Sequence, residues 1–121
     1  LSEDFVFLGA VENPYPYMKH ATAVAVLSDY EAWSLVITEA KVLGVPVIAT
    51  KTAGALEQLE HNVTGILCDF DAEDIAMKME SLMQDNKLRN KIRNNIVGYS
   101  TKIEALVSFK RLLELESLEM K

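Results

Sequence analysis

The sequence has one cysteine, two histidines and no excess of basic residues, and each shortage excludes a class of protein. Its single cysteine, Cys68, rules out an internal disulfide and fits a reducing compartment. The net charge of −6, from 18 acidic and 12 basic residues, argues against a nucleic-acid interface, which needs a basic patch. His20 and His61 stand alone, and no His, Cys and Asp cluster has the spacing of metal ligands. We therefore expect no metal, no other cofactor and no nucleic-acid partner.

Long apolar runs are also missing. None approaches the ~18 residues of a membrane-spanning helix, and no signal peptide is recognisable. A chain of 121 residues, half of them hydrophobic, is expected to form one globular domain over residues 1–121. The expected location is the cytoplasm, with peripheral attachment at the inner face of the membrane left open for the full-length protein.

Short apolar runs alternate with helical patterns along most of the chain. Four runs predict buried strands: Phe5–Leu8, Ala21–Leu27, Val45–Ala49 and Ile66–Cys68. The helices predicted between and after them are a short one ending at His20, then Leu35–Leu43, Ala55–His61 and Asp71–Gln84. The last of these is predicted to have an apolar face formed by Ile75, Met79, Leu82 and Met83. Strands and helices that alternate across short loops predict an α/β fold with a Rossmann-like, doubly wound parallel sheet.

The C-terminal third, residues 85–121, is predicted to be a helical extension of this domain. Leu88, Ile92 and Ile96 form one apolar stripe, and a longer helical segment follows Gly98. The apolar stripe of that longer segment is expected either to pack within the chain or to form a homodimer. Four strands are fewer than the six of the usual dinucleotide-type sheet. We therefore expect the domain to be truncated at its N-terminus, with one or two βα units and a partner domain preceding this sequence.

Two carboxylates bracket the start of one predicted helix. Glu31 lies in the loop after the strand Ala21–Leu27, at the sheet edge where open α/β folds bind ligands, and Glu39 lies in the following helix. Ser34 is predicted to cap that helix, which leaves the backbone N–H groups of Ser34–Val36 free to hold a phosphate. Glu39 lies ~7 Å further along the helix axis and is placed to accept hydrogen bonds from a ribose diol. The spacing fits a nucleotide joined to a sugar through a diphosphate.

Further motifs follow this pair in a fixed order. They are the segment Gly44–Thr50, the loop Ala53-Gly54-(two residues)-Glu57 and the turn Asn62-(two residues)-Gly65-Ile66-Leu67. Together with Glu31-(seven residues)-Glu39, they resemble retaining glycosyltransferases of the two-Rossmann (GT-B) type, family four, the "group 1" glycosyltransferases. The resemblance runs from about Phe5 to Ile96 and implies that this is the C-terminal, donor-binding domain of such an enzyme.

The resemblance also implies roles for particular residues. It assigns nucleotide-sugar binding to Glu31, Trp33, Ser34, Leu35, Glu39 and Gly54. Within that set, Glu31 contacts the donor sugar and is the catalytic candidate, and Glu39 contacts the ribose. The implied reaction moves a hexose from a nucleotide-sugar to an acceptor hydroxyl with retention, without a bound metal, in the synthesis of surface polysaccharides or other glycans. A missing N-terminal domain is expected to bind most of the saccharide or lipid-linked acceptor, so the chain alone is expected to be inactive.

Some positions depart from the family pattern. Ala32 and Ser34 stand where the family commonly has glycines, and Ala53 replaces the first glycine of a Gly-Gly loop. Lys51 either pairs with a phosphate or is simply solvated, and Tyr15 is expected to pack under a loop in preference to touching a ligand. The alternative functions are a non-catalytic nucleotide-sugar-binding domain, a nucleotide-sugar epimerase of the same architecture, and a flavodoxin-like signalling domain. The last of these offers no reason for the two glutamates.

Overall fold

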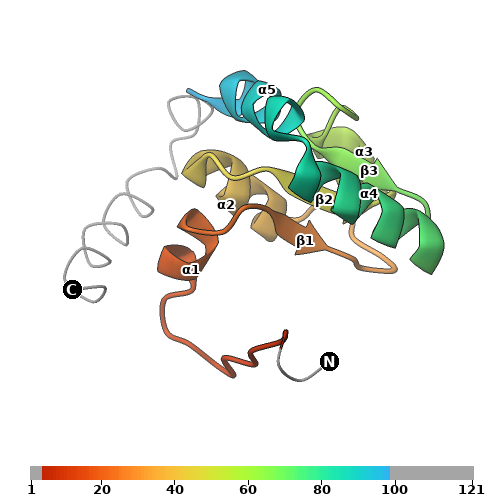
Figure 1. Cartoon of the computed structure of the whole chain (residues 1–121). Coiled ribbons are helices and arrows are strands. Elements are labelled where there is room, and N and C mark those ends of the chain that lie inside the picture. The colour runs from red at the N-terminus through yellow and green to blue at the C-terminus, as the bar shows by residue number, and fades with distance from the viewer. Residues whose placement is uncertain (1–3, 99–121) are drawn as a thin grey trace.

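The computed structural model describes residues 4–98 of the 121-residue chain. Its elements follow the chain in the order α1 (Tyr15–Lys19), β1 (Val24–Val26), α2 (Leu35–Leu43), β2 (Val47–Thr50), α3 (Ala53–Gln58), β3 (Ile66–Cys68), α4 (Ala72–Gln84) and α5 (Asn86–Ile96). The strands form a three-stranded parallel sheet in the order β1-β2-β3 (Figure 1). None of the helices within residues 4–98 is long and apolar enough to cross a membrane.

The sheet has a separate hydrophobic core on each face. One core joins the sheet to α2 and α3 and consists of Ile37, Ala40, Val47, Ala49, Ala55, Leu59 and Leu67. The other joins it to α4 and α5 and consists of Ile48, Ile66, Cys68, Leu82 and Ile92. Because successive side chains of a strand point to opposite faces, Val47 and Ala49 enter the first core and Ile48 enters the second. The predicted α/β fold with a Rossmann-like parallel sheet is confirmed.

Local capping signals set the helix boundaries. Helices α2, α3 and α4 each follow a side chain that accepts a hydrogen bond from the backbone N–H three residues on: Ser34, Thr52 and Asp71. Helix α2 ends at Gly44, whose φ of +75° is a left-handed conformation that glycine adopts without strain. The predicted bounds of α2, its Ser34 cap and its Gly44 terminus are all confirmed.

The predicted strand Phe5–Leu8 is wrong. These residues form no strand, and their side chains are 49–93% exposed. A strand needs a neighbour to complete its hydrogen bonds, and in the usual six-strand order 3-2-1-4-5-6 two other strands lie between the third and the fourth. If β1, β2 and β3 correspond to strands 4, 5 and 6 of that fold, Phe5–Leu8 corresponds to strand 3. It then has no adjacent strand within the described residues. Its apolar composition predicted burial but did not supply the partner.

The helices after β3 agree with their predicted apolar stripes only in part. Ile92 and Ile96 of α5 are buried, and Leu82 of α4 is 1% exposed. Met79 and Met83, predicted on the same stripe of α4, are 38% and 53% exposed, and both line a hollow beside Ala25 of the edge strand β1. The helical segment predicted after Gly98 lies outside the described residues.

Side chains close the outer edge of the sheet at β3. The Leu67 N–H donates to His61 Nδ1 at 3.0 Å, and the Leu67 carbonyl accepts from Lys78 Nζ at 3.1 Å. Lys78 is held by Asp74 at 3.0 Å, one turn earlier in α4. An edge strand with free backbone groups invites pairing with another chain, so these contacts protect β3.

Candidate functional site

The loop between β1 and α2 lies directly against the start of α3. The Gly54 N–H donates to the Glu31 carbonyl at 2.7 Å. A Cβ placed on Gly54 would lie 3.0 Å from the backbone carbonyls of Glu31 and Ala32, which is closer than side-chain carbons normally approach. A larger residue here would require the loop or α3 to shift by a few tenths of an ångström, so glycine suits this contact. The structure shows Gly54 as the residue that lets α3 support the Glu31 loop.

The Glu31 side chain is half-buried where β1 and β2 end. The Ser28 hydroxyl donates to Glu31 Oε1 at 3.4 Å, and the Ser28 carbonyl accepts from Thr50 Oγ1 at 2.5 Å. Thr50 is the last residue of β2, so these bonds tie the two strand ends together beside Glu31. The other carboxylate oxygen of Glu31 has no hydrogen-bond partner within residues 4–98. That oxygen is available to a ligand hydroxyl.

The N-terminus of α2 presents two backbone donors. An α-helix leaves its first four N–H groups without partners inside the helix. The Ile37 N–H is bound by Ser34 Oγ at 3.2 Å, and the Ser34 N–H is bound by Gln58 Oε1 at 2.8 Å. The N–H groups of Leu35 and Val36 have no partner in the described part of the chain. Such a pair of N–H groups, at the positive end of a helix dipole, suits a phosphate.

The prediction that the Ser34 N–H is free was therefore wrong, and the reason is Gln58. Its Nε2 also donates to the Ser34 carbonyl at 2.9 Å and to Thr38 Oγ1 at 3.1 Å. Both partners are buried, with Ser34 1% and Gln58 6% exposed. The sequence does carry a signal for Gln58, since it is a polar residue on the same helical face as Ala55 and Leu59. A buried polar side chain needs hydrogen-bond partners.

Trp33 and Leu35 flank Ser34 in the chain, and both have exposed side chains. The Trp33 ring is 52% exposed and the Leu35 side chain is 71% exposed. Leu35 is the first residue of α2, and Trp33 directly precedes the Ser34 cap. The structure thus places Glu31, Trp33, Ser34, Leu35 and Gly54 around one loop-to-helix junction.

Glu39 lies deeper in α2 and is bound by a residue from α1. A hydrogen bond joins the Tyr15 side chain to the Glu39 carboxylate, and α1 packs against α2 (Figure 1). Burial first, and then this bond and the negative charge of Glu39, raise the pKa of Tyr15 to about 12. The hydroxyl is therefore the donor at neutral pH. Tyr15 is half-buried, as expected for a packed aromatic, but its contact with a candidate site residue was not predicted.

Lys51, which follows β2, is paired within the chain. Its Nζ lies 2.6 Å from Asp69 Oδ1, and this hydrogen bond raises the pKa of Lys51. Both side chains are exposed, so the pair is weak and screened by water. Lys51 would have to leave Asp69 to reach a phosphate.

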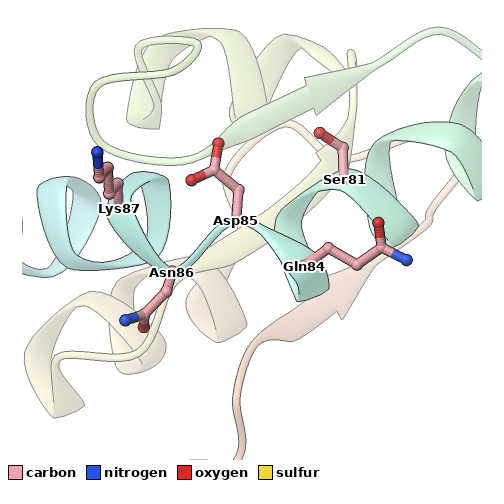
Figure 2. Close-up of a pocket in the computed structure, with 5 residues that line it drawn as sticks. All are labelled: Ser81, Gln84, Asp85, Asn86 and Lys87. Carbon is pink, nitrogen blue, oxygen red and sulfur yellow. The ribbon is translucent and has the colours of Figure 1, made fainter.

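A hollow at the junction of α4 and α5 is lined by none of the predicted site residues. It has a volume of about 440 Å³ and is lined by Ser81, Gln84, Asp85, Asn86 and Lys87 (Figure 2). Asp85 Oδ1 accepts from the Leu88 N–H at 2.9 Å, and so caps α5. The hollow is therefore explained by the change of direction between α4 and α5, where Asp85 caps the second helix. Residues 4–98 contain no group of three or more His, Cys, Asp or Glu side chains that could hold a metal ion.

Similar proteins share both the sequence pattern and the fold of this region. Residues 1–97 match the family described as "Glycosyl transferases group 1". The chain is 32% identical over 89 residues to N-acetyl-alpha-D-glucosaminyl L-malate synthase of Bacillus anthracis, covering 73% of this chain and 23% of that protein. It is 31% identical over 91 residues to the capsular polysaccharide biosynthesis glycosyltransferase CapM of Staphylococcus aureus, covering 74% and 24%.

A solved structure has a similar fold over most of this chain. The crystal structure of Anabaena HepE in complex with UDP-glucose superposes with a TM-score of 0.67 at 28% identity, covering 84% of this chain and 29% of HepE. The chain spans about a quarter of the length of the curated relatives described above. The matched residues include Glu31, Glu39 and the whole α2–α3 junction. On this evidence, the chain belongs to the glycosyl transferases group 1 family.

Proposed function

We propose that this chain is the donor-binding domain of a retaining glycosyltransferase that moves a sugar from a nucleotide-sugar to an acceptor hydroxyl. The observation that carries the proposal is the N-terminus of α2, where the free N–H groups of Leu35 and Val36 lie between Glu31 and Glu39 along the chain. The family match supports it, and so does the likeness to HepE, which was crystallised with UDP-glucose and with UDP. A UDP-sugar is therefore the first donor to test.

Each part of the site has a separate task in this proposal. The two N–H groups and the helix dipole hold the diphosphate, at about 0.3–1 kcal/mol for the dipole alone. Glu39 accepts hydrogen bonds from the ribose hydroxyls, and the unpaired oxygen of Glu31 accepts one from the donor sugar. Hydrogen bonds to charged groups contribute about 1.5–3 kcal/mol each. Lys51 is held by a weak, exposed pair with Asp69, so it joins the diphosphate site only by leaving that partner.

The whole protein is proposed to contain a second domain that binds most of a saccharide or lipid-linked acceptor. Similar proteins include the capsular enzyme CapM and a Campylobacter jejuni enzyme named as acting on a diphospho-undecaprenol sugar. These names support a role in the synthesis of surface polysaccharides. Because a transferase needs both substrates held together, residues 1–121 alone are proposed to lack turnover.

Calorimetric titration of the full-length protein with UDP and UDP-glucose tests the assignment. Glu39→Gln is expected to weaken both ligands about tenfold, the effect of one charge-assisted hydrogen bond. Glu31→Gln is expected to weaken UDP-glucose but not UDP, because Glu31 contacts the sugar. Glu80→Gln, on the exposed surface of α4, is the matched control and should leave both affinities unchanged.

Unchanged binding in both site variants would show that the two glutamates are not the donor site. Binding without transfer by the full-length protein would instead assign a non-catalytic nucleotide-sugar-binding domain. Conversion of the UDP-sugar to its epimer, without an acceptor, would assign an epimerase. Turnover by residues 1–121 alone would contradict the proposed need for a second domain.

A further inference from the structure

We propose that Gln58 is a positioning residue of the diphosphate site, which acts by orienting the backbone N–H groups at the N-terminus of α2. This inference rests on the proposed function, because it concerns how that site is held. Gln58 is buried and so does not itself face a ligand. Its side chain is 6% exposed and lies behind Ser34, which is 1% exposed.

The Gln58 amide is fully used by α2. Its Oε1 accepts from the Ser34 N–H at 2.8 Å, and its Nε2 donates to the Ser34 carbonyl at 2.9 Å and to Thr38 Oγ1 at 3.1 Å. An amide has two N–H donors, so both are engaged. The Ser34 carbonyl has two further contacts, from the Thr38 N–H and Oγ1, and both are long at 3.3 Å. Gln58 therefore makes the shortest hydrogen bond to that carbonyl.

Peptide planarity carries this constraint to the ligand side. The Ser34 carbonyl and the Leu35 N–H belong to one planar trans peptide group and point in opposite directions. By holding that carbonyl, Gln58 turns the Leu35 N–H away from α3 and towards the open end of α2. The Leu35 side chain is 71% exposed, so this first residue of the helix faces solvent. Rotation of the peptide group would misalign the first of the two phosphate donors.

Helix α3 is itself anchored, which makes Gln58 a rigid support. At its start, the Gly54 N–H donates to the Glu31 carbonyl at 2.7 Å. At its end, the Gln58 carbonyl accepts from Lys41 Nζ of α2 at 2.8 Å. Helix α3 thus connects the Glu31 loop, which carries the proposed sugar contact, to the N-terminus of α2, which carries the proposed diphosphate contact.

The ratio of UDP affinity to uridine affinity, measured by calorimetry on the full-length protein, isolates the contribution of the diphosphate. Gln58→Leu is expected to lower this ratio about tenfold, which is the effect of misplacing one charge-assisted hydrogen bond. The affinity for uridine alone, which lacks the diphosphate, should change less than about twofold. Gln58→Asn keeps the amide group but shortens the side chain, so it should also lower the ratio. This variant replaces Gln58→Leu in the test if Gln58→Leu does not fold. Gln84→Leu, on the exposed end of α4, is the control.

The possible outcomes separate this inference from the proposed function. An unchanged ratio in the folded Gln58 variants overturns the positioning role while leaving the proposed function intact. An equal loss of both ligands, with a lower melting temperature, assigns Gln58 a purely structural role and also overturns it. A wild-type protein that binds neither UDP nor uridine overturns the proposed function itself.

Discussion

Gly54 offers a sharp test of how the Glu31 loop is supported. In an unobstructed helix, replacing glycine by alanine stabilises a protein by about 0.4–1 kcal/mol. At Gly54 the new Cβ would lie 3.0 Å from the carbonyl carbon and oxygen of Ala32 and from the carbonyl oxygen of Glu31. These are backbone atoms, so the loop and α3 must move apart. They cannot do so without lengthening the 2.7 Å bond from the Gly54 N–H to Glu31.

The size of the effect follows from these opposing contributions. Overpacking a close contact costs about 1–3 kcal/mol. Set against the helix-propensity gain of about 0.4–1 kcal/mol, this leaves Gly54→Ala destabilised by about 0–2.6 kcal/mol, with a central value of about 1.3 kcal/mol. Displacement of the loop should also weaken UDP-glucose more than UDP, because Glu31 is the proposed sugar contact.

Urea denaturation and calorimetric titration measure these two effects. Ala53→Gly is the matched control, since Ala53 is exposed in the same turn of α3. It should lose about 0.5–1 kcal/mol of stability through helix propensity and leave ligand selectivity unchanged. A Gly54→Ala protein more stable than wild type, with normal UDP-glucose binding, would refute the close approach of α3 to the loop.

Two further predictions concern hydrogen bonds made by titratable side chains. Burial and nearby lysine charges lower the pKa of His61 below its ordinary 6.5, and the Leu67 N–H donates to its neutral Nδ1. As the pH falls below 6.5, the unfolded chain binds a proton first, so the free energy of unfolding should decrease until the folded-state pKa is reached. Urea denaturation at several pH values should show a smaller acid dependence in His61→Gln, and an equal slope would contradict the bond. Tyr15→Phe removes the donor to the Glu39 carboxylate and should cost about 1.5–3 kcal/mol in the same assay. A Tyr15→Phe protein as stable as wild type would show that this hydrogen bond contributes nothing.

Local sequence signals were sufficient for α2, but not for α3, which was predicted at Ala55–His61 and lies at Ala53–Gln58. The apolar period and the capping residues set α2 at Leu35–Leu43, between Ser34 and Gly44, because both signals act within a few residues of where they stand. The order of strands and helices likewise predicted the α/β class, since short loops between a strand and a helix leave few arrangements. The Glu31 and Glu39 pair was singled out by its spacing together with the family resemblance of the motifs that follow it, and its role in donor binding stays a prediction.

Contacts between distant residues depended on the tertiary structure. The bond that occupies the Ser34 N–H comes from Gln58, 24 residues later, and the bond to Glu39 comes from Tyr15 in a separate helix. Phe5–Leu8 shows the same dependence, because an apolar run forms a strand only where a neighbouring strand is present. The sequence by itself determined which residues need burial or a hydrogen-bond partner. Only the fold decided which partner each one meets, because that depends on the packing of α1 and α3 against α2 and on the strand order of the sheet.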